Sequence, residues 1–422
     1  MKKANLRYYV WNQSFYQGDA GSSPDTTNDQ NLCLKQRNDS QGGREDNTQK
    51  LIIGYWPLAN KIQQSIPNSH LPMNNNFLLS SCKFLYLRFD RAMNPPLIFC
   101  LFLMTMLIGP GLGCFAAEVR IGKSCVARFV GREEGIAAIT QRDSYTAQLS
   151  RFDLQVRLST ERNVTIDDWA RFVAGEVEEW SAKDCERISL LLDSVRRRIA
   201  KLALPLPHEI LLVATTGKEE SNAAYCRGAA IALPQQIRAG TDTQLESLLI
   251  HELFHVISNQ NPQLKASLYR LVGFELCEPL AIHPSLRDRR ITNPDAPHID
   301  CVIELVDGNR AFYAAPILYA STAQFDPKKL GLFGYLEFRL MVLEKVGDQW
   351  KPADKEGRAV VVDPKKSRSF QEKTGGNTSY IIHPEEILAD NFVHMVLERP
   401  NLATPQIVIG LRKVLAGDEP TK

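Results

Sequence analysis

The residue types best suited to chemistry stand together in the segment His251-Glu252-Leu253-Phe254-His255. Residues four apart lie on the same face of a helix, so His251 and His255 can direct imidazole nitrogens at one metal ion. Glu252 lies beside them, where its carboxylate can take a proton from a water whose pKa a bound zinc ion has lowered to about 7. The spacing therefore predicts a zinc centre that activates water.

The alternative is a pair of ordinary histidines on a structural helix. The chain has only eight histidines, and a chance match to this pattern is expected on the order of one time in a hundred. The flanking residues are apolar, so both rings should be buried, and buried imidazoles need partners. The residues in question are Leu248, Leu249, Ile250, Leu253, Phe254, Val256 and Ile257. A metal ion would supply the missing partner.

Local signals define the elements that position this motif. Thr241 and Gln244 have the spacing of a capping box, which predicts a helix that begins there and continues through the motif. Residues 209–216 and 228–233 read as two buried strands before it. Thr165 is a candidate N-cap for an earlier helix, and residues 183–202 have the apolar period of another. The order is helix, strand, strand and motif helix.

This order, the HExxH motif and a later segment together resemble the zincin metallopeptidases, specifically the gluzincin branch. In that family a glutamate on a later helix is the third zinc ligand, in the pattern ExxxD, and the aspartate orients a zinc-bound histidine. The resemblance implies that Glu386 is the third ligand and that Asp390 orients one histidine. It covers roughly residues 185–260 and 380–395. Glu275 stands closer to the family's usual spacing, but Pro279 occupies the position of the aspartate, so we favour Glu386.

The resemblance also implies how a substrate is bound. In zincins the strand before the motif helix is an edge strand that pairs with an extended peptide, and here Ala229, Ile231 and Leu233 would lie on it. A tyrosine or histidine usually donates to the oxyanion, and Tyr380 and His383 are the nearest candidates. For these two residues, an aromatic at a strand end and a helix-capping histidine are equally open interpretations.

The sequence before residue 118 predicts export. Residues 1–92 are rich in Asn, Gln, Ser, Asp and Gly and are expected to be disordered or a mis-assigned upstream extension. Residues 97–108 are apolar but too few to span a bilayer, and they lie between basic residues and the small pair Ala116-Ala117. This pattern indicates a signal peptide over residues 93–117 that starts near Met93. A signal anchor with a short cytoplasmic tail is the competing interpretation. The expected location is secreted or periplasmic.

The predicted fold class is α+β and zincin-like. We expect a small mixed sheet and the motif helix in residues 118–260, and a mainly helical subdomain with an inserted β-hairpin region in residues 261–422. Residues 261–277 should be helical, Val306-Asp307-Gly308-Asn309 should be the hairpin turn, and residues 384–397 and 404–415 should be the final helices. None of the nine cysteines forms a CxxC pair, so a cysteine-based zinc site is not indicated.

The expected function is zinc-dependent peptide-bond hydrolysis outside the cytoplasm, with a peptide or protein as substrate. The net charge of +2 gives no reason to expect a nucleic-acid partner, and no stable membrane span is expected after signal cleavage. The alternative is a catalytically silent zincin-fold protein that binds a peptide or envelope partner. All the catalytic groups are present, so the sequence does not separate the two.

Overall fold

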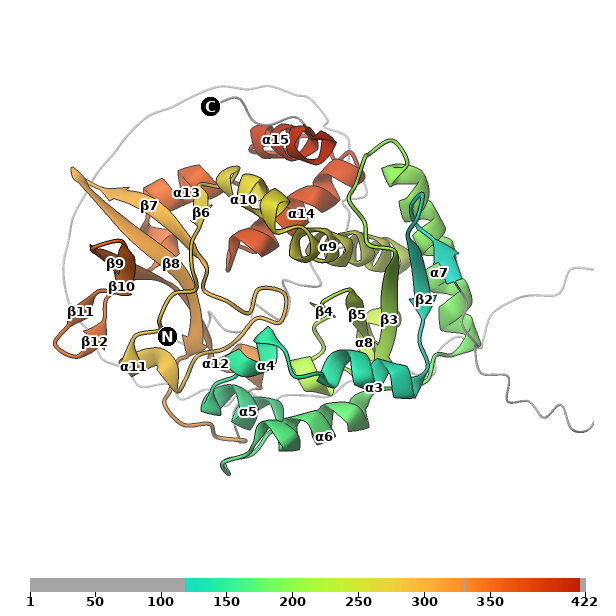
Figure 1. Cartoon of the computed structure of the whole chain (residues 1–422), viewed down its shortest axis with the longest axis horizontal. Coiled ribbons are helices and arrows are strands. Elements are labelled where there is room, and N and C mark those ends of the chain that lie inside the picture. Colours follow the sequence, from blue (N-terminus) through green and yellow to red (C-terminus); the bar gives the residue numbers. More distant parts are fainter. Residues whose placement is uncertain (1–117, 329–330, 418–422) are drawn as a thin grey trace, which may run out of the picture. The chain divides into compact units, whose positions relative to one another are not determined.

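The computed structural model describes residues 118–328 and 331–417. These residues form a mixed α+β structure with two main sheets (Figure 1). Residues 1–92 and the signal peptide expected over residues 93–117 lie outside the described residues. Within the described ranges, no helix has both the length and the apolar character needed to cross a bilayer.

The first sheet is small and mixed, as the sequence predicts. Its strands lie in the spatial order β1-β2-β3-β5-β4, with β2, β3 and β5 parallel and both outer strands antiparallel to their neighbours. The strands are β1 (Glu118–Arg120), β2 (Val126–Phe129), β3 (Glu209–Thr215), β5 (Ala230–Pro234) and β4 (Tyr225–Arg227).

Helices cover both faces of this sheet, because β3 is apolar on both sides. Ile210 and Leu212 pack in one core cluster with helices α7 (Ala182–Ile199) and α9 (Asp242–Gln260). Leu211 and Val213, which point the other way, pack against α3 (Arg132–Thr140) and α6 (Ile166–Glu176). The sheet is therefore the middle layer of three. Short helices connect this region: α4 (Ser144–Gln148), α5 (Arg151–Arg157), η1 (Lys218–Glu220) and α8 (Gln235–Arg238).

The second sheet corrects the expectation of a mainly helical C-terminal part. It has six strands, with β10-β9-β8-β7-β6 in antiparallel order and β13 pairing with β9. The expected hairpin is present, with Gly308 at a positive φ of 58° in its turn. It belongs to a larger meander of β6 (Phe274–Leu276), β7 (Cys301–Asp307), β8 (Arg310–Ala320), β9 (Leu336–Val346), β10 (Gln349–Pro352) and β13 (Val361–Val362). A separate two-stranded ribbon joins β11 (Asp354–Lys355) and β12 (Arg358–Ala359).

The helix expected over residues 261–277 is shorter than predicted. Helix α10 (Pro262–Arg270) ends before Gly273, which has a φ of 81°, and the chain then enters β6. A Cβ atom on Gly273 would lie 2.9 Å from the side chain of Lys373, so a larger residue is excluded by both conformation and space. The apolar residues after Gly273 belong to a strand rather than to another helical turn.

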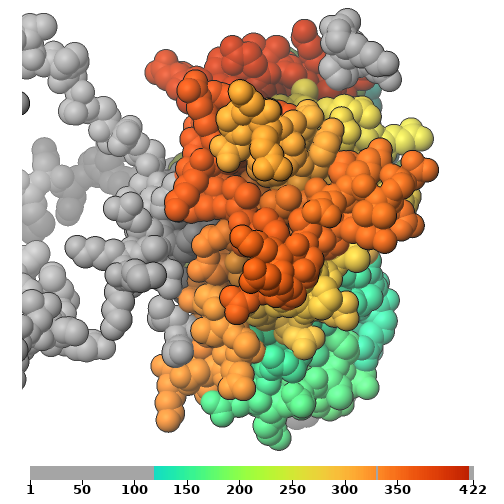
Figure 2. All heavy atoms as spheres, turned by 90° about the vertical axis from the view of Figure 1, so that its left-hand side faces the viewer, coloured from blue at the N-terminus to red at the C-terminus, as the bar shows by residue number. Residues whose placement is uncertain are grey.

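The last helices complete the core around α9. Helix α14 (Pro384–Val396) packs along α9, and α15 (Pro405–Ala416) packs on α14 and α10. One cluster of buried apolar residues runs from Ile121 to Leu415 and includes α7, α9 and α14, so the core is continuous across residue 260. In Figure 2 the second-sheet region, in orange, lies between α15, in red, and the green N-terminal helices. The other short helices are α11 (Pro284–Arg287), α12 (Leu332–Tyr335), η2 (Pro364–Lys366) and α13 (Arg368–Thr374).

Candidate metal centre

Helix α9 holds the two histidines and the glutamate of the motif. It begins with the expected capping box, in which Thr241 and Gln244 bond each other's backbone N–H groups. The motif lies in the middle of the helix, beneath the first sheet, and all three side chains are buried. His251, Glu252 and His255 are 7%, 2% and 1% exposed, so each polar atom must find its partner inside the protein.

Helix α14 brings Glu386 to both histidines. The Oε2 atom of Glu386 lies 3.2 Å from Nε2 of His251 and 3.5 Å from Nε2 of His255. One ligand atom from each of the three residues lies within 4.8 Å of the others. The residue expected from the sequence as third ligand therefore stands with the histidine pair, although it is 135 positions from His251 along the chain.

A carboxylate holds the far side of each histidine ring. Nδ1 of His251 lies 3.0 Å from Asp390, and Thr378 donates a hydrogen bond of 2.5 Å to the other oxygen of that carboxylate. Nδ1 of His255 lies 3.3 Å from Glu385. A hydrogen bond from Nδ1–H to each carboxylate leaves the lone pair on Nε2, which is the tautomer that binds a metal.

Glu385 and Asn293 are parts of the site that the sequence reasoning missed. Glu385 is fully buried and accepts hydrogen bonds from Ser258, at 2.9 Å, and from Tyr269, at 2.7 Å. Asn293 donates a 2.6 Å hydrogen bond to Oε1 of Glu386 and so fixes the orientation of that carboxylate. The position of Glu385 next to Glu386 was a signal for its role. Asn293 lies in a turn that belongs to neither motif, and no sequence signal indicated its role at the metal centre.

The donor set fits a divalent transition metal. Two imidazole nitrogens and one carboxylate oxygen are the ligands of many catalytic zinc sites, with a further position open for water or substrate. Nε2 of His255 is buried and has no hydrogen-bond partner among the described residues, which is costly unless a ligand occupies that direction. His251, His255 and Glu386 can therefore hold a metal ion.

The electrostatics of the site favour a cation. Burial lowers the pKa of His251, but hydrogen bonds to Asp390 and Glu386 outweigh it and raise that pKa to about 10. Burial also lowers the pKa of His255, and nearby carboxylates raise it above the usual range. Burial raises the pKa of Glu386, whereas the two histidines bring it well below the usual range. Protons and a metal ion would thus compete for the same nitrogens.

No family model, curated protein or solved structure matches this chain. The geometry of the described residues is therefore the basis for any statement about function.

Glu252 lies beside the centre in a buried polar cluster. The Cys226 thiol donates to Oε2 of Glu252 across 3.3 Å, and the backbone N–H of Cys226 donates to Asp295 across 2.7 Å. Burial raises the pKa of Glu252 above its usual value, with the histidines acting in the opposite direction. A carboxylate with a raised pKa is suited to take up a proton near neutral pH.

The expected substrate strand is not an edge strand. Strand β5, which contains Ile231 and Leu233 and follows Ala229, has β3 on one side and β4 on the other. The backbone of Ala229 also bonds Leu211, and Ile231 and Leu233 are buried. The edge is β4, a three-residue strand too short for a sequence pattern to reveal. The expectation that β5 is an edge strand is therefore wrong.

The two candidate oxyanion donors are in different surroundings. Tyr380 lines the same cavity as the metal centre, with its ring centroid 6.4 Å from that of His251. His383 is buried, and its Nδ1 accepts from the backbone N–H of Glu385, so it is the N-cap of α14. Burial lowers the pKa of His383 to about 4, and its Nε2 faces Cys301 rather than the cavity. His383 is not among the residues that line the cavity, and its capping role is confirmed.

Glu275 is not near the metal centre. It lies on β6, opposite Val302 in the second sheet, and its side chain is exposed. The alternative assignment of Glu275 as third ligand is therefore excluded.

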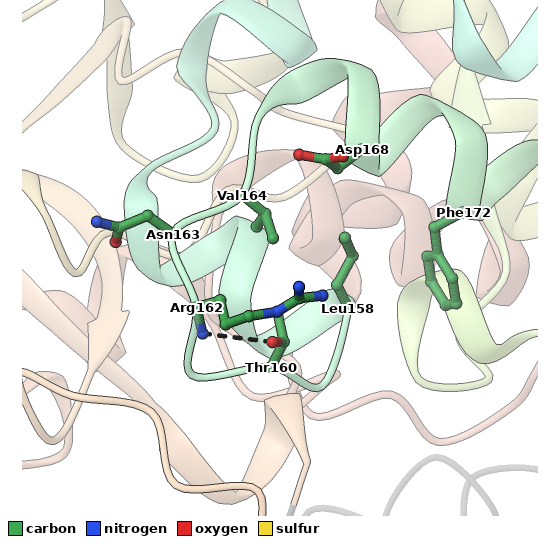
Figure 3. A pocket seen from close by; sticks show the side chains of 7 residues that line it. All are labelled: Leu158, Thr160, Arg162, Asn163, Val164, Asp168 and Phe172. Carbon is green, nitrogen blue, oxygen red and sulfur yellow. Dashed lines mark hydrogen bonds between the residues drawn. The ribbon is translucent and has the colours of Figure 1, made fainter.

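A cavity of about 900 Å³ opens onto the metal centre. Its lining includes His251, Glu252, Glu386, Tyr380 and the chain just before β4. A smaller hollow of about 300 Å³ lies between the end of α5 and helix α6 (Figure 3). Arg162, Thr160 and Asp168 line that hollow, which has no histidine or cysteine in its lining and shares no residue with the large cavity. The large cavity is the candidate functional site.

Proposed function

We propose that this protein is a zinc-dependent peptide hydrolase with a zincin-like architecture. The observation that supports the proposal is the convergence of Nε2 of His251 and His255 on Glu386, with a carboxylate on the far side of each ring. Two ring-orienting carboxylates are more than a structural histidine pair requires, and they are the arrangement found around metal-bound imidazoles.

In this proposal His251, His255 and Glu386 hold the zinc ion. When bound, the ion would polarise a substrate carbonyl and lower the pKa of a water molecule. Glu252 takes the proton from that water and returns it to the leaving amine, for which its raised pKa suits it. Tyr380, on the wall of the cavity, donates a hydrogen bond to the developing oxyanion.

The peptide would lie in the cavity of about 900 Å³ beside the edge of the first sheet. Asp295 covers the edge at Cys226, because it accepts the backbone N–H of that residue. Ala223 and Ala224 line the cavity just before β4. The N–H of Ala223 already donates to the carbonyl of Glu220, so an extended substrate would use the other backbone groups of this segment. We therefore assign substrate pairing to this segment in place of β5.

The test compares the full chain with Glu252→Gln. Both proteins are loaded with zinc, their zinc content is measured, and each is incubated with a mixed peptide library read out by mass spectrometry. We expect cleavage by the wild type and at least a hundredfold less by the variant, because the proton acceptor is lost. Glu275→Gln makes the same chemical change on an exposed strand and should be as active as the wild type. If wild type and Glu252→Gln both hold zinc and are equally inert, a binding protein of the same fold is the better interpretation.

The proposed location outside the cytoplasm rests on the sequence of residues 93–117. Mass spectrometry of the native N-terminus tests it. A mature chain that begins near residue 117 is expected, and recovery of peptides from residues 1–92 would contradict a start at Met93.

A further inference from the structure

The charged side chains around the cavity are unevenly neutralised. Of the basic residues in its lining, Arg157 forms salt bridges with Asp153, at 2.6 Å, and Glu220, at 2.7 Å. Arg339 forms one with Glu337, at 2.8 Å. These two guanidinium groups already have carboxylate partners and are not available to a ligand.

Lys365, the fourth basic residue of the lining, is exposed and forms no salt bridge with a described residue. Arg399 differs from Lys365 in its burial and from the two paired arginines in its partners. It is half-buried in the lining of the cavity, and no carboxylate of the described residues lies within salt-bridge distance of it. Its backbone N–H donates to the carbonyl of His394, which ties the residue to the end of α14. One guanidinium nitrogen donates to Oγ of Ser247 across 3.3 Å. The remaining guanidinium N–H groups have no side-chain partner among the described residues and can bind a planar anion.

The contact with Ser247 places the Arg399 side chain against α9, N-terminal to the metal centre. Ser247 lies four positions before His251 on α9, which is about one helical turn, or a rise of roughly 6 Å. A guanidinium bonded to α9 about one turn from His251 would reach a group a few residues along an extended peptide from the scissile bond, since each residue spans about 3.3 Å.

Most acidic residues of the lining already have partners other than Arg399. Glu220 and Glu337 are paired with arginines. Asp363 accepts the backbone N–H of Lys365 at the start of a short helix and keeps its negative charge. The other carboxylates, of Glu252, Asp295, Glu386 and Asp390, belong to the metal centre and its surroundings. Beyond the metal centre, the charged lining residues without a salt bridge to a described residue are therefore Arg399 and Lys365, which are positive, and Asp363, which is negative and lies two positions from Lys365.

We propose that Arg399 binds a carboxylate of the peptide substrate and makes the site selective for acidic peptides. This inference rests on the proposed peptidase function. The carboxylate belongs either to an aspartate or glutamate side chain near the scissile bond or to the C-terminus of the peptide. Both present two oxygens in the plane that a guanidinium recognises with paired hydrogen bonds.

Two families of peptides distinguish these sources. In the first, N-acetylated and C-amidated hexapeptides carry glutamate or glutamine at one position at a time. In the second, the same glutamine peptides end in a free carboxylate. We expect the wild type to prefer the carboxylate-bearing member in one family by roughly 10- to 100-fold in kcat/KM. Arg399→Gln should abolish that preference, with the larger loss of kcat/KM on the carboxylate-bearing peptides.

Matched variants separate binding from general effects. Arg399→Lys keeps the charge but not the paired hydrogen bonds, so it should retain part of the preference. Arg412→Gln removes one positive charge from the exposed face of α15 and should change nothing. Thermal unfolding of each variant checks that it is folded.

A second readout keeps the inference independent of catalysis. If the zinc-loaded wild type cleaves no peptide, the proposed function fails, and binding of the same labelled peptides to zinc-loaded Glu252→Gln is measured by fluorescence anisotropy. In that case, the inference is supported if Glu252→Gln binds the carboxylate peptides more tightly than the neutral ones and the double variant Glu252→Gln/Arg399→Gln does not. The inference is overturned if the preference for carboxylate-bearing peptides, measured by cleavage or by binding, is the same with and without the Arg399 guanidinium.

Discussion

Glu385 offers the sharpest test of how this site is built, because it is buried, close to His255 and adjacent to the proposed ligand Glu386. Glu385→Gln keeps the shape of the side chain but removes the negative charge that faces Nδ1 of His255. The variant also has only one acceptor oxygen left for Ser258, Tyr269 and His255. The imidazole of His255 loses both its orientation and part of its basicity.

The expected loss follows from these contacts. Replacing a carboxylate that holds a metal-bound histidine typically weakens metal affinity by about 10- to 100-fold, or about 1.4 to 2.7 kcal/mol. Tyr269→Phe removes only one of the hydrogen bonds to Glu385 and leaves the charge in place. Since a single hydrogen bond to a charged group contributes about 1.5 to 3 kcal/mol to stability, this control should lower stability more clearly than it lowers zinc affinity.

Competition against a fluorescent zinc chelator measures the affinity, and urea unfolding of the metal-free proteins measures stability. Glu275→Gln, on the exposed side of β6, should match the wild type in both assays. Zinc affinity in Glu385→Gln within about twofold of the wild type would refute the reasoning, because a carboxylate at His255 would then have no influence on the metal.

Two further predictions concern residues around the metal centre, and a third concerns Glu219, a buried residue of the short helix η1. Glu386→Gln should lose zinc at a chelator concentration that the wild type and Glu275→Gln withstand; equal retention by all three would contradict the ligand assignment. Tyr380→Phe should lower kcat by about 100-fold if it is the oxyanion donor, whereas His383→Asn, which keeps a capping side chain, should leave kcat within a few-fold. Burial raises the pKa of Glu219 from 4.5 to about 7. The native state therefore keeps a proton that the unfolded chain releases, and stability falls as pH rises from about 4.5 to about 7. Glu219→Gln should be more stable than the wild type at pH 8 by up to about 3 kcal/mol, with little difference at pH 4.5, in urea unfolding.

The sequence was most informative where local chemistry defines structure. The capping boxes at Thr241 and Thr165 placed the starts of α9 and α6 within a residue, because a side chain that bonds its own helix needs no distant partner. Glu386 was found for a different reason, since its spacing to Asp390 repeats a family pattern.

The features that the sequence did not predict depend on contacts between segments that are distant along the chain. Glu385 and Asn293 acquire their roles from His255 and Glu386, and no local period marks such pairs. Strand β4 escaped detection because three residues show no alternation. The apolar residues after Gly273 fit a helix or a strand equally well, and the positive φ of that glycine decided between them.

His251 and Glu386 are 135 positions apart in the sequence, and this separation determines when the site can assemble during biosynthesis. An ion held by both helices would act as a cross-link between early and late parts of the chain, so no such cross-link can form until α14 has been synthesised. The second sheet lies in the segment between α9 and α14, and the bound ion would join the two ends of that segment. Because closing a loop of twice the length costs only about 0.6 kcal/mol more, insertions at the exposed turn around Gly308 should be tolerated without disturbing the residues that close it.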